Sequence, residues 1–189
     1  MGQMTTGSLG VSFTHKRAFT FSAKKVQAAA LNPVSRKSLF TSHMKKIAKD
    51  LEQVILEFLS ADLKSQNWNY RAGPQKWTKK EIIGHLIDSA QINLQRFVRS
   101  TYSENFKVTY EQVEWVDAQR YFEADLSDLL DLWRLLNKQI IRVLENYPPD
   151  RLQVQCDTGK TGIGFQTVEF LAQDYLNHLN HHLRAIDLG

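Results

Sequence analysis

Apolar residues recur at helical spacing in four separate stretches of the chain. The first stretch covers residues 44–63, the second 78–99, the third starts near residue 125, and the fourth covers about 167–186. Each stretch has one apolar face and one polar face, as an amphipathic helix does. Four such helices joined by long connections predict an all-α fold, a four-helix bundle, in which binding sites form between facing helices.

The second and third helices carry clear start signals. Thr78 and Glu81 have the spacing of a capping box, and Trp77 and Ile82 have that of a hydrophobic staple. Asp125 is a favourable N-cap residue for the third helix. These signals predict helix starts immediately after Thr78 and Asp125.

Two connections could contribute to a site. Residues 101–124 are irregular and rich in aromatic residues, with a short helical turn expected over Val113–Arg120. These aromatic side chains either cover the mouth of a pocket or simply cap the core. Residues 150–166 contain glycine and predict a loop with at most a short extended piece.

The basic charge of the chain is concentrated at its N-terminal end. Residues 1–43 contain six Lys/Arg and no acidic residue, so the remaining 18 Lys/Arg and 20 Asp/Glu give residues 44–189 a net charge of −2. We therefore expect a basic, disordered N-terminal extension over 1–43 and a bundle domain over 44–189, with translation from Met44 as another interpretation. A mildly acidic domain does not favour nucleic-acid binding.

The length and the cysteine content narrow the class of protein. A chain of 189 residues favours one domain with a single core. The single cysteine, Cys156, cannot form an internal disulfide or a cysteine-based zinc site, and it favours a reducing, cytoplasmic location. No apolar run approaches the roughly 20 residues of a membrane helix, so we expect no membrane partner.

Histidines are the most informative polar residues. His178 and His182 are one turn apart and face the apolar stripe of the fourth helix, whereas His181 falls outside it. On the second helix His85 begins a polar ridge that continues with Ser89 and Asn93. Buried imidazoles need partners for their nitrogens, and a divalent metal provides one.

Three neutral imidazoles suit zinc or nickel. Three protein ligands also leave positions open for water or substrate, which is the pattern of a catalytic site. We therefore predict His85, His178 and His182 as metal ligands, with Ser89 and Asn93 as candidates for the pocket wall. Spacing alone does not establish that the second and fourth helices are neighbours.

Two motifs resemble those of the DinB superfamily, close to its YfiT-like metal-dependent hydrolases. They are Trp77 with EIIGHLIDSA in the second helix and HLNHH in the fourth. The resemblance covers about residues 44–187. It implies an up-down-down-up bundle with a long crossover, a homodimer, and a metal triad that corresponds to His85, His178 and His182.

Three functions remain open at this point. The metal could activate water for hydrolysis of a small substrate. It could instead bind a low-molecular-weight thiol as thiolate for S-transfer, as relatives of the family do. The third possibility is a non-enzymatic metal-binding or dimerisation module. The sequence offers hydrolysis no clear general base, since Asp174 and Glu81 are expected on the outer side of the apolar stripes.

Overall fold

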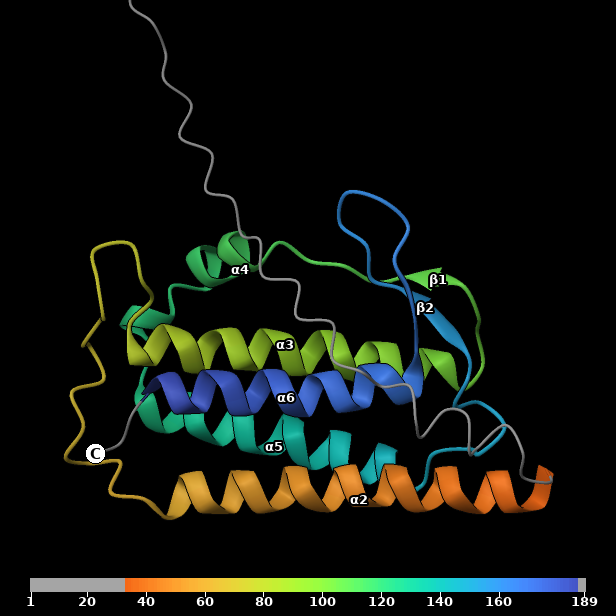
Figure 1. Cartoon of the computed structure of the whole chain (residues 1–189). Coiled ribbons are helices and arrows are strands. Elements are labelled where there is room, and N and C mark those ends of the chain that lie inside the picture. Colours follow the sequence, from red (N-terminus) through yellow and green to blue (C-terminus); the bar gives the residue numbers. More distant parts are fainter. Residues whose placement is uncertain (1–32, 187–189) are drawn as a thin grey trace, which may run out of the picture.

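A computed structural model of the protein describes residues 33–186. Four long helices form its body (Figure 1): α2 (Pro33–Ser60), α3 (Lys79–Ser100), α5 (Leu126–Glu145) and α6 (Val168–Ile186). The smaller elements are α4 (Gln112–Gln119), the 3-10 turn η1 (Tyr121–Glu123), and the strands β1 (Phe106–Lys107), β2 (Gln155–Asp157) and β3 (Phe165–Thr167). The prediction of a helical bundle with four long helices is confirmed, and α4 matches the expected short helix.

The first helix starts earlier than the sequence indicates. It begins at Pro33 and not near Met44. Among the α2 residues whose burial is described, the buried ones start at Met44. The sequence of the first turns lacks the regular apolar spacing that sequence analysis relies on. Extending an existing helix needs no new nucleus, and proline is favoured at the first helical position. The expected boundary at residue 43 thus falls inside α2, while residues 1–32 lie outside the described residues.

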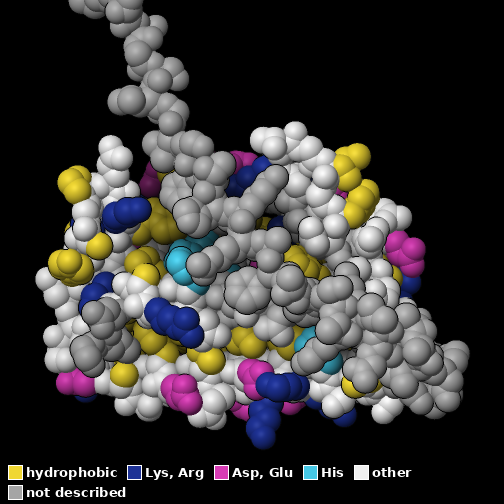
Figure 2. Space-filling model, viewed as in Figure 1, with side chains coloured by type: hydrophobic (Ala, Val, Ile, Leu, Met, Phe, Trp, Pro, Cys, Tyr) yellow, Lys and Arg dark blue, Asp and Glu magenta, His cyan; other side chains and the backbone are white. Residues whose placement is uncertain are grey.

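The four helices pack in a ring in which α2 and α3 each contact both α5 and α6. Phe97 near the end of α3 accepts a hydrogen bond from Tyr147 just after α5, so α3 and α5 run in the same direction. His85 near the start of α3 instead meets His178 in the second half of α6, so these two helices are antiparallel. Consecutive helices α2 and α3 therefore lie across the ring, which explains their long connection. Both acidic and basic side chains lie along the outer edge of α2 (Figure 2).

A small three-stranded sheet departs from the all-α expectation. Strand β2 pairs in parallel with β1 and antiparallel with β3, with Phe106 opposite Cys156. The strands are too short for a periodic pattern to reveal them. They join the connection before α4 to the hairpin before α6, and this pairing places both segments beside the bundle.

Close packing of η1 on α3 orders the segment after α4. A Cβ atom at Gly84 would lie 2.0 Å from the ring of Tyr121, so only glycine fits there. The Tyr121 hydroxyl donates a 2.6 Å hydrogen bond to Asp88, which is fully buried. Gln119 donates a second one to the same oxygen. Burial raises the pKa of Asp88.

No helix within residues 33–186 is both long enough and apolar enough to cross a membrane.

Candidate metal centre

The start of α3 is fixed by the predicted capping box. Thr78 Oγ1 accepts a hydrogen bond from the Glu81 amide, and the Glu81 carboxylate accepts one from the Thr78 amide. Both bonds satisfy donors that a helix start otherwise leaves unpaired. The cap sets the phase of α3, and His85 then lies about two turns into the helix with only 1% of its surface exposed.

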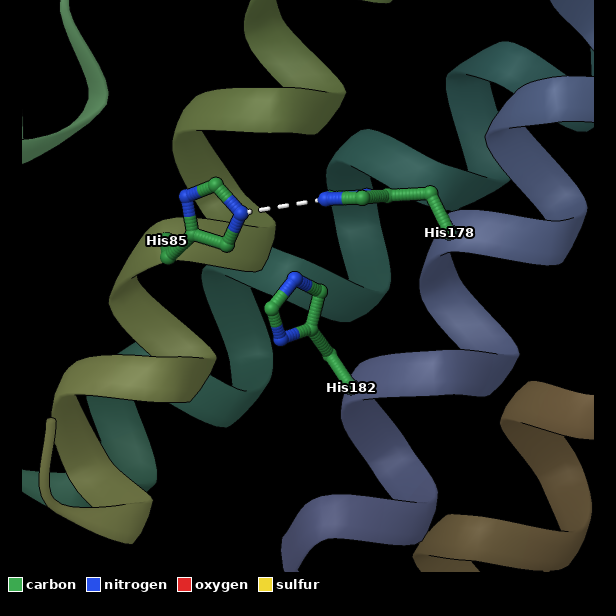
Figure 3. Close-up of side chains that lie close together, drawn as sticks. All are labelled: His85, His178 and His182. Atoms are coloured by element: carbon green, nitrogen blue, oxygen red, sulfur yellow. Dashed lines mark hydrogen bonds between the residues drawn. The ribbon is translucent and has the colours of Figure 1, made fainter. Parts of the chain in front are cut away.

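Three histidines from two helices converge between α3 and α6 (Figure 3). His85 comes from α3, while His178 and His182 come from successive turns of α6. One ring nitrogen from each lies within 4.8 Å of the other two. The Nε2 atoms of His85 and His178 are 3.1 Å apart. Two nitrogens on one tetrahedral zinc ion are about 3.3 Å apart, from bond lengths of about 2.05 Å, so this spacing suits a shared cation.

The three rings are neutral at physiological pH. Burial, followed by the charges of neighbouring histidines, lowers the pKa of His85 from 6.5 to about 3. The same causes lower the pKa values of His178 and His182 to about 4. Metals bind the neutral imidazole, so no proton has to leave these rings before a cation can bind.

Neighbouring side chains hold the rings in place. Ser89 Oγ lies 3.4 Å from His178 Nδ1. When Nδ1 carries the hydrogen and donates it to Ser89, the Nε2 lone pair of His178 stays free to face His85. Trp77 covers His85 with ring centroids 4.8 Å apart. His85 Nδ1 is buried with no hydrogen-bond partner among the described residues.

His181 does not join the cluster. It is exposed, and it meets only the outer side of the triad, with its ring centroid 5.2 Å from that of His182. The group of side chains in residues 33–186 that could share one cation consists of His85, His178 and His182. The geometry thus brings together the three predicted residues and leaves His181 outside.

The polar ridge of α3 continues from the histidines as a hydrogen-bonded row. Asn93 Nδ2 donates to the Ser89 carbonyl at 2.9 Å, and Arg96 Nη1 donates to Asn93 Oδ1 at 3.2 Å. Both Ser89 and Asn93 are buried. The row leads from His178 to the guanidinium of Arg96, one turn beyond Asn93.

A cavity of about 220 Å³ opens beside this row, and His178 is part of its wall. The cavity is lined mainly by polar side chains from α3, from the segment after β1, from the β2–β3 hairpin and from α6: Ser89, Asn93, Arg96, Thr109, Tyr110, Gln112, Thr158, Lys160, Asp174, Tyr175 and His178. The His178 ring of the candidate metal site thus faces a cavity that can hold a small molecule.

The family model of the DinB superfamily matches residues 50–186. The chain belongs to the DinB superfamily. Among solved structures it is similar to YfiT from Bacillus subtilis, described as a probable metal-dependent hydrolase with an unusual four-helix bundle topology. The identity is 20% and the TM-score 0.62, over 83% of this chain and 86% of YfiT. At this identity the similarity shows a shared fold. No curated protein matches the chain.

Several cavity residues of this DinB-superfamily chain escaped sequence analysis. Asp174 was expected on the outer side of its stripe, but it lines the cavity while also reaching solvent. Its position four residues before His178 is the signal that places both on one edge of α6. Arg96 follows Asn93 by three residues and extends the α3 ridge in the same way. Tyr110 and Lys160 carry no such signal, because they lie in irregular segments.

The aromatic connection serves both of its expected roles. Tyr110 lines the cavity and packs edge-on against Trp115, with ring centroids 5.3 Å apart. Tyr121 instead belongs to the core under α3. Tyr102 does neither, since 71% of its surface is exposed.

Proposed function

We propose that the protein is a metal-dependent hydrolase of small molecules, with His85, His178 and His182 as ligands of one divalent cation, zinc or nickel. The observation that carries the proposal is the convergence of three neutral imidazoles, one of which, His178, lines a cavity. The donor set fits such an ion, because each of the three neutral rings offers a nitrogen lone pair. The description of YfiT as a probable metal-dependent hydrolase agrees with this function.

When bound, a divalent ion on three imidazoles acts as a Lewis acid that makes water a nucleophile near neutral pH. The chain supplies the rest of the site. Ser89 orients His178 through Nδ1, and the cavity holds the substrate beside that ring. Three protein ligands leave room for water and substrate at the ion.

The structure offers Asp174 as a candidate general base, which sequence analysis had not identified. Its carboxylate lies on the cavity wall, one helical turn before His178. Burial raises the pKa of Asp174, and the Arg96 charge opposes this rise. A carboxylate with a raised pKa is a stronger base. Because Asp174 lines the cavity, we propose that it takes a proton from the attacking water and returns it to the leaving group as the scissile bond breaks.

Thiol S-transfer is the second candidate, and the composition of the cavity wall favours it. The wall carries polar or cationic groups that are suited to holding the carboxylates of a low-molecular-weight thiol: Arg96, Lys160 and Tyr110. A purely non-enzymatic module accounts less well for a cavity at the triad, because a structural metal site is normally closed.

We also propose the assembly and topology implied by the family resemblance. The up-down-down-up order is supported by the parallel course of α3 and α5 and the antiparallel course of α3 and α6. A homodimer is supported by exposed leucines on neighbouring helices, Leu56 on α2 and Leu132 and Leu135 on α5. The proposed cytoplasmic location rests on the single cysteine, Cys156.

The decisive experiment is metal analysis of purified wild type, His182→Ala and His181→Ala. His182→Ala removes one of three ligands and should lower metal affinity by roughly 100-fold or more, given about 10–16 kcal/mol for four-ligand zinc sites. His181→Ala should retain wild-type metal content. Loss of metal in His181→Ala but not in His182→Ala would refute the assigned ligand set.

Activity assays then separate the two reactions. The metal-loaded protein should be tested on a panel of esters and amides and on a panel of thiols with electrophiles. Hydrolysis that depends on metal and falls in Asp174→Asn supports the first candidate. Thiol-dependent transfer without hydrolysis favours the second. Bound metal without activity on either panel favours the non-enzymatic module.

A further inference from the structure

Arg96 is a cation held rigidly on the cavity wall by neutral acceptors. Its Nε and Nη2 atoms donate to the Val108 carbonyl at 3.2 and 2.8 Å, and Nη1 donates to Asn93 Oδ1 at 3.2 Å. No carboxylate among residues 33–186 forms an ion pair with it, whereas Arg71, Arg120, Arg134 and Arg151 each have one. Arg96 is therefore held in place without an ion pair among the described residues, although the charge of Asp174 acts on it from a longer distance.

Holding such a charge in a half-buried position costs free energy. Burial lowers the pKa of Arg96, which shows that the surroundings disfavour the cation. The guanidinium nevertheless stays charged, because its pKa is far above neutral. Its planar fork has five N–H donors, and the three observed bonds leave two of them for a ligand. A group preorganised in this way suits a planar anion such as a carboxylate.

Besides Arg96, the cavity wall carries one paired cation and one carboxylate without an ion pair in the described part of the chain. Lys160 lies on the β2–β3 hairpin, where it pairs with Glu111 at 3.4 Å. Asp174 is the one carboxylate among the lining residues, and no ion pair joins it to Arg96 or Lys160. Thr109, Thr158 and Gln112 add neutral polar groups to the wall. Because Glu111 offsets the charge of Lys160, an anionic occupant is favoured by Arg96 itself, which has N–H donors to spare and no ion pair within residues 33–186.

The hairpin that carries Lys160 is itself held in place. Asp157 Oδ1 accepts hydrogen bonds from the amides of Gly159 and Gly164, at 2.9 and 2.8 Å. A Cβ atom at Gly159 would lie 1.9 Å from the Gly162 carbonyl oxygen, so the turn requires glycine there. The two cationic side chains of the cavity wall therefore come from two separate, ordered segments, α3 and the β2–β3 hairpin.

We propose that the cavity takes a small molecule with a carboxylate group, which binds Arg96 while the reactive part of the molecule lies at His178. The inference rests on the proposed function, since it takes the cavity to be the substrate site. Arg96 lies seven residues after Ser89, which contacts His178. The Arg96 side chain extends toward the start of α3 and binds Asn93. At 1.5 Å per residue the carboxylate and the reactive centre lie roughly 6–10 Å apart.

Glutarate and its neutral analogue glutaramide are matched probes for the Arg96 site. The ¹⁵N-labelled full-length protein is titrated with each compound in the absence of metal, and the Arg96 side-chain Nε–H resonance is followed by NMR. Glutarate should shift this resonance saturably, and glutaramide should not. Arg96→Gln should weaken glutarate binding by roughly tenfold or more, as expected for loss of a charge-assisted bond.

Two variants complete the test. Arg99→Gln is the control, because Arg99 is on the same helix but packs over Phe106 and does not line the cavity; it should bind glutarate like wild type. Asp174→Asn removes a negative charge from the wall and should strengthen binding. Equal responses to glutarate and glutaramide in wild type overturn the inference, whether or not Arg96→Gln folds.

The metal site is tested separately in the same samples by adding zinc. Zinc binding without a glutarate response contradicts the anion site and leaves the proposed metal centre intact. A glutarate response without zinc binding supports the anion site and contradicts the proposed function.

Discussion

Acid should destabilise the metal-free protein because the three triad histidines stay neutral in the folded state at pH values where the unfolded chain protonates them. In the unfolded chain each has a pKa near 6.5, whereas in the folded protein the values are about 3 for His85 and about 4 for His178 and His182. Between these values the unfolded state binds more protons than the folded state. The contribution of each histidine is therefore fully present above pH 6.5 and is lost as the pH falls toward the folded value.

The size of the effect follows from the same values. At pH 5 an unfolded histidine gains about 2 kcal/mol from protonation, while the folded ones remain largely neutral. Three of them give an upper bound of about 6 kcal/mol, comparable with the about 5–15 kcal/mol of a typical domain, and solvent screening reduces the share of His178 and His182, which are only partly buried. Asp88 and Asp174 act in the opposite direction, because their raised pKa values favour the folded state at low pH. The measured loss should therefore be smaller than this upper bound.

Urea denaturation of the metal-free protein between pH 7 and pH 5 measures this loss. The variant His182→Asn removes one titrating group and should reduce the pH dependence by about one third, while His181→Asn, with its exposed side chain, is the control. Added zinc binds the neutral rings of the folded protein and should move the acid transition to lower pH. Constant stability between pH 7 and pH 5 would refute the reasoning, as would an equal change of slope in both variants.

Three further predictions concern single positions and assembly. Ser89→Ala should weaken metal binding by about tenfold, the low end for a lost partner of a ligand histidine, because its contact with His178 is long at 3.4 Å; competition with a chelator measures this. Gly84→Ala should destabilise the fold by about 1–3 kcal/mol or more, since its Cβ would meet the Tyr121 ring at 2.0 Å; urea denaturation should also show partial rescue by Tyr121→Leu. Sedimentation equilibrium at micromolar concentration should show a homodimer, and a monomer alone would contradict that proposal.

The helices and the triad were predictable because local patterns determine them. An apolar stripe reports which side of a helix is buried, and the capping box fixes where α3 begins. His178 and His182 share a face through their spacing alone. Their meeting with His85 required α3 and α6 to be neighbours, which spacing does not specify; the family resemblance supplied that step. The start of α2 was missed because its first turns carry no apolar stripe.

The cavity was beyond sequence analysis because its wall comes from segments distant in the chain. Tyr110 follows β1 and Lys160 follows β2, and these strands meet through the pairing of Phe106 with Cys156. Three residues at most form each strand, too few for a periodic signal. Only the α3 and α6 sides of the wall, with Ser89, Asn93, Arg96 and Asp174, follow helical spacing.

The cavity wall thus has a helical part and a loop part, and we expect catalysis to depend on the first and substrate selection on the second. The triad and its support at Ser89 lie on two long helices whose packing is fixed by the core, which suits ligands that must keep a constant geometry. Lys160 and Tyr110 lie on connecting segments, which tolerate sequence change far better than a packed helix face. Arg96 lies between these parts, because its backbone is on α3 while its guanidinium binds the Val108 carbonyl of the connection. Replacing the loop residues should therefore change which acidic molecule binds, whereas replacing Arg96 should abolish the preference for an acid.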